Sequence, residues 1–162
     1  MQSTGTADLP LSLERSWQFL TDFSLVSLCV PGLKSMKIVK PNEELDLDVV
    51  VNFGAMTQAY QLRVVLASIE PPRRAQLRIR GKGSGTFIGA SSSLRLEELR
   101  EDTTRLHWSF VFSIFGQAVS VGDRLIARVV EKVSEEFVNR LQDHARSLGT
   151  GAPQARRSGL AS

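Results

Sequence analysis

Apolar and polar residues alternate along five stretches in the middle of the chain. The stretches are residues 45–53, 60–66, 75–79, 86–97 and 106–114. Successive side chains of a β-strand point to opposite faces, so each stretch predicts a strand with one covered face and one face toward water. Three short turn sequences separate them: Gly54-Ala55, Pro71-Pro72 and Glu101-Asp102. Strands joined by such short turns predict an antiparallel sheet.

In the N-terminal part of the chain, ahead of these strands, apolar residues have helical spacing instead. Ser12 is a good N-cap for a first helix that ends near Asp22. Residues 23–28 predict a second, short helical turn, which Pro31 and Gly32 stop.

A longer helix is predicted after the strands. Apolar residues recur every three or four positions from Val121 to about Arg146, and Ser120 with Asp123 forms a start that resembles a capping box. At 1.5 Å per residue this helix would be roughly 39 Å long, enough to cross a whole sheet.

Together these elements predict an α+β fold in one domain, residues 1–148. A short strand ending within residues 8–11 opens the chain, two short helices follow, then about six strands, and the long helix comes last. A curved antiparallel sheet of about seven strands would wrap around that C-terminal helix. Residues 149–162 are small, polar and aperiodic, so we expect a disordered C-terminal tail.

Composition and charge exclude several classes of function. The chain is 42% hydrophobic, enough for a core without structural metal, and Cys29 is its one cysteine. It has no signal-peptide pattern and no apolar run that could span a membrane, so we expect a cytoplasmic protein. The net charge of +3 is modest, and Arg78, Arg80 and Lys82 alternate with apolar residues as on a solvated strand face. We therefore expect no nucleic-acid binding.

Signals for catalysis and metal binding are scarce. His107 and His144 are far apart, and no group of Cys, His and Asp has the spacing of a metal site. No G-x-S-x-G motif surrounds the serines at 91–93. The glycines of residues 81–89 lie between two strand-like segments, which indicates a bend and not a phosphate-binding loop. We expect no catalytic residue and no metal or covalent cofactor.

The apolar positions that face the predicted helix remain as candidates for binding. They either fill the core or line a cavity for an apolar small molecule, and the pattern alone leaves both interpretations open. These candidate ligand-binding residues are Val49, Val51, Phe53, Tyr60, Leu62, Val64, Leu77, Ile79, Trp108, Phe110, Phe112, Leu125, Val129 and Val133.

Four sequence segments, in this order and at fitting spacings, resemble a known family. They are W-Q-F-L-T-D at 17–22, C-V-P-G at 29–32, G-K-G-S-G at 81–85 and G-D-R-L-I at 122–126. The combination resembles the CoxG family, the G subunits of carbon monoxide dehydrogenase, which belongs to the START-like helix-grip (SRPBCC) superfamily. The resemblance extends over nearly all of residues 5–145.

This resemblance implies a helix-grip fold with a hydrophobic cavity. It also implies a role beside molybdenum hydroxylases of the carbon monoxide dehydrogenase type, in assembling them, attaching them to the cytoplasmic membrane or linking them to its quinone pool.

Three functions follow from this resemblance and from the residues. The first is a non-enzymatic carrier of a quinone-like or lipid-like molecule that serves a molybdenum hydroxylase. The second is a ligand-free module for assembly or membrane recruitment of that enzyme. The third is a cavity enzyme of the cyclase or hydrolase type, for which Tyr60 is the visible polar candidate on an apolar face.

Two departures from the family concern the cavity mouth and the membrane. Thr86-Phe87-Ile88 follows the glycine segment where relatives carry more glycine or alanine, and we expect Gly83, Gly85, Phe87 and Ile88 at the mouth. The C-terminal tail has Leu160 as its one large apolar residue, too little for a stable membrane anchor. Peripheral contact with the inner face of the cytoplasmic membrane would therefore involve the domain itself, through Phe87 and Ile88.

Overall fold

The computed structural model describes residues 1–83, 85–116 and 122–158, and side chains through residue 149. Seven strands, three α-helices and a short 3-10 helix (η1) follow one another in these residues. They are β1 (Gln2–Leu9), α1 (Leu13–Leu20), α2 (Phe23–Val26), η1 (Ser27–Cys29), β2 (Leu33–Lys40), β3 (Glu44–Phe53), β4 (Met56–Glu70), β5 (Arg74–Gly83), β6 (Thr86–Arg100), β7 (Thr103–Gly116) and α3 (Asp123–Ser158).

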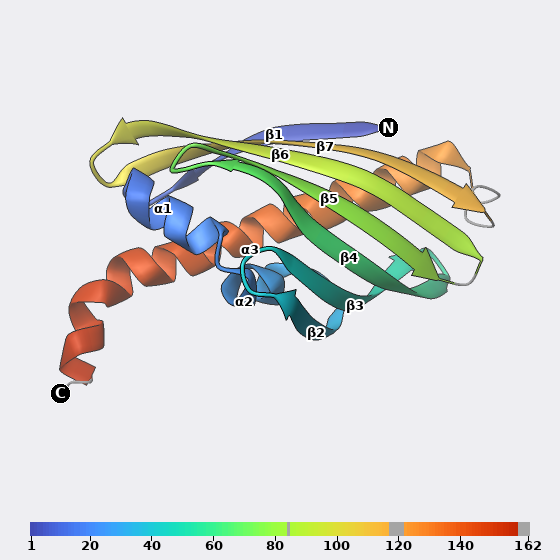
Figure 1. Ribbon diagram of the computed structural model, residues 1–162, viewed down its shortest axis with the longest axis horizontal. Helices are drawn as coiled ribbons and strands as arrows, with labels where there is room; N and C mark the ends of the chain where they lie inside the picture. Colours follow the sequence, from blue (N-terminus) through green and yellow to red (C-terminus); the bar gives the residue numbers. More distant parts are fainter. Residues whose placement is uncertain (84, 117–121, 159–162) are drawn as a thin grey trace.

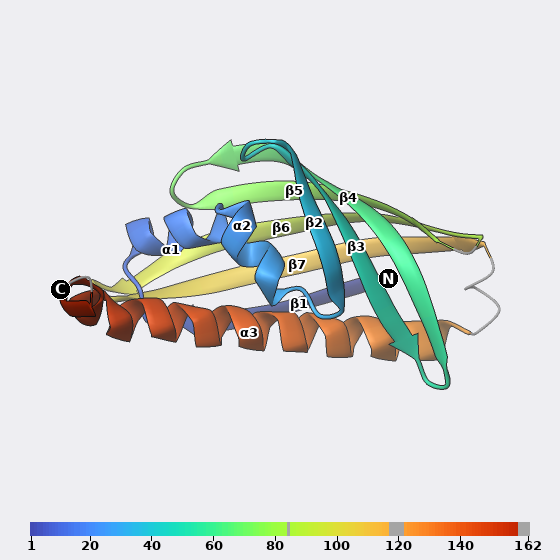
Figure 2. The same cartoon turned by 90° about the horizontal axis from the view of Figure 1, so that it is seen from below.

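All seven strands form one antiparallel sheet in the order β1-β7-β6-β5-β4-β3-β2. The sheet curves over α3, and β2 and β3 bend toward the helix at one edge (Figure 1). All three α-helices lie on the same face, which we call the inner face (Figure 2). Along α3, close contacts are made with β1 and β3, which lie toward opposite edges of the sheet. This is the α+β helix-grip arrangement that the sequence predicts.

Local sequence signals set the boundaries of the first helices as expected. The Ser12 hydroxyl accepts a hydrogen bond from the backbone N–H of Arg15 at 3.2 Å and caps α1. A carboxylate oxygen of Asp22 accepts from the N–H of Ser24 at 3.1 Å and caps α2. Both caps satisfy N–H groups that have no partner inside their helix, which is why these polar residues mark helix starts.

The β3–β4 hairpin also confirms its sequence signal. Phe53 pairs with Met56, so Gly54 and Ala55 form a two-residue turn. Gly54 has a φ of 65°, a backbone conformation that such tight hairpin turns need and that glycine adopts without steric cost. The turns expected at 71–72 and 101–102 lie between β4 and β5 and between β6 and β7.

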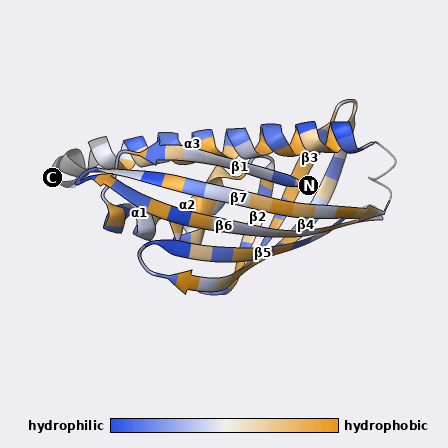
Figure 3. Cartoon of the chain, turned by 90° about the horizontal axis from the view of Figure 1, so that it is seen from above, coloured by the Kyte–Doolittle hydropathy of each residue, from blue (hydrophilic) through white to orange (hydrophobic). Residues whose placement is uncertain are grey.

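Two buried clusters form the core, one at each side of the inner face. The α1 cluster consists of Leu9, Leu11, Leu13, Phe19, Leu20, Cys29, Leu96, Leu106, Leu141 and Ala145. The β3–β4 cluster consists of Phe23, Leu45, Leu47, Val49, Phe53, Tyr60 and Val64. Hydropathy alternates along β5, β6 and β7 (Figure 3).

The long helix differs from its prediction at the C-terminal end. Instead of ending near Arg146, α3 continues to Ser158, so the helix boundary was placed too early. Gly149 lies within the helix. A Cβ there would lie 2.8 Å from the carbonyl oxygen of Pro10, so glycine lets α3 approach the segment that follows β1 closely. The Arg15 side chain also donates to the carbonyl of Leu148 at 3.1 Å. The assignment of residues 149–162 to a tail outside the domain stays a prediction.

Two other details could not be read from the pattern. Strand β2 has no strict alternation, because register shifts between Leu33 and Ser35 and between Ile38 and Lys40 interrupt its pairing with β3. The capping role expected for Ser120 and the start at Val121 lie outside the described residues, and the described helix begins at Asp123.

Candidate ligand-binding face

The sheet register brings the predicted strand residues together in rows across the inner face. One row joins Val64, Ile79, Ala90 and Phe112, and the next joins Leu66, Leu77, Ser92 and Phe110. Phe110 and Phe112 stack with their ring centroids 5.5 Å apart. Val129 of α3 packs against the β3–β4 cluster. The candidates from four strands therefore share one side of the sheet with Val129, and their binding of a ligand stays a prediction.

These candidates divide into buried residues and residues that solvent still reaches. Buried are Val49, Phe53, Tyr60, Val64 and Phe112. Partly accessible are Val51, Leu62, Leu77, Ile79, Trp108, Phe110, Leu125, Val129 and Val133. Core residues of a closed interior would be buried throughout. The partial solvent accessibility of the second set of candidates indicates that α3 covers the middle of the inner face incompletely.

Small side chains occupy the centre of this partly covered region. Ala90 and Ser92 on β6 stand between the larger side chains of β5 and β7, and both are partly accessible. The two buried clusters lie on either side of them. These short side chains fill less of the centre of the inner face than their neighbours on β5 and β7 do.

A groove of about 340 Å³ opens where the inner face meets α3 at the β1 edge. Trp108 and Phe112 contribute from β7, residues 1–4 from the N-terminal strand, and Val130 from the helix. Its lining is completed by Ala127, Glu131 and Glu135. This volume lies in the range of pockets that hold small molecules.

One buried polar atom beside this groove lacks a partner. The indole N–H of Trp108 is enclosed by protein and donates no hydrogen bond within the described residues. The ring lies against Gly5 of β1, where a Cβ would come within 2.7 Å of the ring atom Cζ2. A buried donor without an acceptor is unfavourable, and the packing of Trp108 against β1 carries this cost.

Ser92 is a functional candidate that the sequence reasoning missed. Its hydroxyl has no hydrogen-bond partner among the described residues, and it faces inward with Leu94 and Leu96. The alternation of residues 86–97 could have identified it, because Ser92 lies at the same inward-facing positions of that strand as these two leucines.

Tyr60 is packed as a core residue. It is buried, its ring meets Phe53 edge to face at 6.4 Å, and its hydroxyl pairs with Thr86. Burial raises its pKa, and the hydrogen bond from Thr86 opposes this shift. Gly83 approaches β4 closely, because a Cβ there would lie 2.1 Å from the carbonyl oxygen of Ala59 and 3.0 Å from Cδ1 of Tyr60.

Of the four residues expected at the cavity mouth, the two with large side chains face opposite sides of the sheet. Ile88 faces inward and packs against the β3–β4 cluster, whereas Phe87 faces outward and is 58% exposed. Gly85 has a φ of 75° next to the β5–β6 turn, a conformation that favours glycine. Their role at a mouth stays a prediction.

Other candidate chemistry is sparse in the described part of the chain. No three His, Cys, Asp or Glu residues there are grouped closely enough to hold a metal ion. Cys29 is buried, and desolvation raises the pKa of its thiol. His107 lies on the outer face, with Nε2 2.8 Å from a carboxylate oxygen of Glu97. None of the helices within the described ranges is long and apolar enough to span a membrane.

The fold is similar to that of solved START-like proteins. It is similar to a conserved protein from Geobacillus kaustophilus (TM-score 0.83, 22% identity, 91% of this chain and 97% of the other). It is also similar to a START superfamily protein from Mycobacterium smegmatis (TM-score 0.71, 16% identity, 91% and 98%). A third similar structure is the Zhui aromatase/cyclase from Streptomyces sp. R1128 (TM-score 0.70, 15% identity, 91% and 94%). At these identities the likeness establishes the fold alone.

Sequence comparison establishes the family. The family model of the carbon monoxide dehydrogenase G subunit (CoxG) matches residues 5–146, and the chain belongs to this family. No curated protein matches the chain significantly.

Proposed function

We propose that this protein is a non-enzymatic carrier of an apolar small molecule, quinone-like or lipid-like, which it binds on the inner face of its sheet. The observation that carries the proposal is the partial accessibility of apolar side chains that face the helix, Leu77, Ile79 and Phe110 among them. Exposed apolar surface that is concave and continuous is typical of ligand sites.

The polar groups of this face favour binding over catalysis. Ser92 offers a single hydroxyl at the centre of the face, and the acids that line the groove, Glu131 and Glu135, lie on its helix side. Such an isolated hydroxyl suits the orientation of a ligand oxygen. The Zhui neighbour is by its title an aromatase/cyclase, so an enzymatic function is the competing outcome of the tests.

The name of the family supports an oxidoreductase as the partner protein. CoxG is named as the G subunit of carbon monoxide dehydrogenase, which ties its members to this oxidoreductase, and we propose that the chain accompanies a molybdenum hydroxylase of that type. A carrier would then exchange its ligand between this enzyme and the cytoplasmic face of the membrane.

Filling the inner face tests the carrier function. In Ala90→Phe, a ring enters the row between Ile79 and Phe112, whereas in Ser91→Phe the same ring points to the opposite face. We expect Ala90→Phe to weaken binding of an environment-sensitive apolar dye about tenfold, a change of ~1.4 kcal/mol. Ser91→Phe should bind the dye as the unaltered protein does.

Extraction of freshly purified protein gives an independent measurement. Native mass spectrometry should detect a co-purified apolar molecule in the unaltered protein and in Ser91→Phe, and less of it in Ala90→Phe. Dye binding that is equal in both variants, with no co-purified molecule, would contradict the carrier function. Capture of the hydroxylase by a ligand-free protein would then favour the assembly module.

A further inference from the structure

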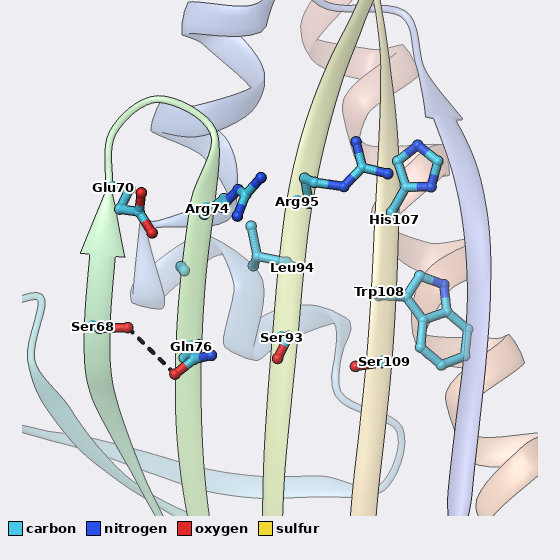
Figure 4. Close-up of a pocket in the computed structure, with 11 residues that line it drawn as sticks. Ser68, Glu70, Arg74, Gln76, Ser93, Leu94, Arg95, His107, Trp108 and Ser109 are labelled. Carbon is cyan, nitrogen blue, oxygen red and sulfur yellow. Dashed lines mark hydrogen bonds between the residues drawn. The ribbon is translucent and has the colours of Figure 1, made fainter.

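A second and larger hollow lies on the outer face of the sheet, away from the helices. It measures about 640 Å³ and crosses β4, β5, β6 and β7 near the β4–β5 turn (Figure 4). Its lining residues are Ser68, Glu70, Arg74, Ala75, Gln76, Ser93, Leu94, Arg95, His107, Trp108 and Ser109.

Two neighbouring rows of the sheet account for this hollow. In one row Glu70, Arg74, Arg95 and His107 are paired across four strands. In the next outward row the pairs join Ser68, Gln76, Ser93 and Ser109. Long side chains therefore stand beside a row of mostly short ones, and the short row forms the floor.

The two guanidinium groups of this hollow have no ion-pair partner. Arg74 and Arg95 occupy directly opposite positions on β5 and β6, and neither makes an ion pair or a side-chain hydrogen bond in the described structure. Glu70 lines the hollow but forms no ion pair with Arg74. Like charges directly opposite one another destabilise a sheet. A bound anion would reduce the electrostatic repulsion between Arg74 and Arg95.

Two other acids of the outer face, Glu97 and Asp8, are already engaged, whereas Glu70 lies directly opposite Arg74 in the lining of the hollow. Glu97 contacts His107 at 2.8 Å, and this hydrogen bond is the main reason why the Glu97 pKa is lowered, with a smaller effect from the charge of Arg95. At the edge of the same face, the Asp8 carboxylate accepts two hydrogen bonds from Arg105, at 2.8 and 3.2 Å. Glu97 and Asp8 are therefore not left to pair with Arg74 and Arg95, and the two guanidinium groups share the hollow with a single carboxylate, that of Glu70.

The floor adds neutral donors at the same place. The Ser68 hydroxyl lies 3.5 Å from the side-chain oxygen of Gln76, so the amide NH₂ of Gln76 is left as a donor. The hydroxyls of Ser93 and Ser109 lie side by side on β6 and β7 and have no partner in the described residues. Two guanidinium forks with an amide and two hydroxyls are the donor set of an oxyanion site.

From these contacts we infer that the outer hollow binds a phosphate or carboxylate group through Arg74 and Arg95, with Gln76, Ser93 and Ser109 donating from the floor. The anion belongs either to a free solute or to the headgroup of an anionic lipid. This site lies on the face opposite the apolar ligand and does not depend on the carrier function.

An NMR titration tests the site. We would add inorganic phosphate, and separately pyrophosphate, to ¹⁵N-labelled full-length protein at constant ionic strength, and follow the backbone amides of residues 76, 93 and 109. A second arm uses vesicles of phosphatidylcholine with and without phosphatidylglycerol, scored by co-sedimentation. The variant is Arg74→Gln/Arg95→Gln, and its matched control is Arg128→Gln on the exposed side of α3.

We expect saturable chemical-shift changes at the floor residues, with binding about 25-fold weaker in the double variant, roughly fivefold for each arginine, as for exposed charge pairs. The Arg128→Gln control should bind as the unaltered protein does. Binding only to phosphatidylglycerol vesicles, lost in the double variant, would support the same site with a lipid headgroup as the anion. No saturable response in either arm, or equal responses in the double variant and the control, would overturn the inference. Because the double variant removes a like-charged pair, it should melt no lower than the unaltered protein.

Discussion

Two leucine-to-alanine substitutions measure how completely the inner face is filled. Leu106 is 3% exposed and belongs to the α1 cluster, whereas Leu77 is partly accessible and stands beside Ser92 at the centre of the sheet. Removing a buried leucine side chain costs the lost transfer free energy and also leaves a new cavity. For Leu106→Ala we expect a loss of about 3 kcal/mol of unfolding free energy.

Leu77→Ala should cost much less. Part of its surface is already exposed to water, and in the proposed carrier it borders the space for the ligand, so its removal would widen that space instead of creating a cavity. We expect a loss of about 1 kcal/mol, close to one buried CH₂ group. The difference of ~2 kcal/mol between the variants corresponds to a ratio of about 30 in their folding equilibrium constants.

Urea unfolding at equilibrium, followed by the fluorescence of Trp17 and Trp108, would measure both losses. Equal slopes of free energy against urea for the two variants would show that the comparison is between native states of similar compactness. If Leu77→Ala and Leu106→Ala lose the same free energy of unfolding, the centre of the inner face is packed as tightly as the core. The carrier function would then lose its structural basis.

Three further outcomes are expected. Gly5→Ala should lower the free energy of unfolding by about 1–3 kcal/mol and shift tryptophan emission, because its Cβ would lie 2.7 Å from the Trp108 ring; an unchanged melting temperature would contradict the close contact. Arg63 lowers the pKa of Asp46, so this carboxylate stabilises the fold above its unfolded pKa and ceases to do so as the pH falls through its folded pKa. Asp46→Asn should therefore flatten the acid limb of the stability profile in urea titrations, slightly because the pair is exposed. Burial raises the pKa of the Cys29 thiol, so it should react with Ellman's reagent slowly in the native protein and rapidly in urea; equal rates would refute this.

Local interactions explain why much of the fold could be predicted from the sequence. A cap such as Ser12 acts on the N–H groups of its own helix, and the turn at Gly54 depends on two residues. The alternation along β7 likewise reports which side chains share a face, because the geometry of a strand places every second residue on one side. Each of these effects needs only neighbours in the chain.

Predictions were incomplete where a contact with a distant segment decides the outcome. The helix was expected to end near Arg146, yet Gly149 lies within α3 against the carbonyl of Pro10. Strand β2 lacks alternation, and its register shifts exist only in its pairing with β3. The orphan N–H of Trp108 likewise results from the packing of its ring over Gly5 on another strand.

The sequence by itself determined which faces of the strands and of the long helix are apolar, and hence that a sheet would cover a helix. Only the tertiary structure decided how tightly that inner face is filled, because volume depends on the curvature of the sheet and on where α3 rests. The tertiary structure likewise decided that a hollow lined by arginines forms on the outer face. Arg74 and Arg95 lie twenty-one positions apart in the chain, and they become opposite partners only through the register of β5 and β6.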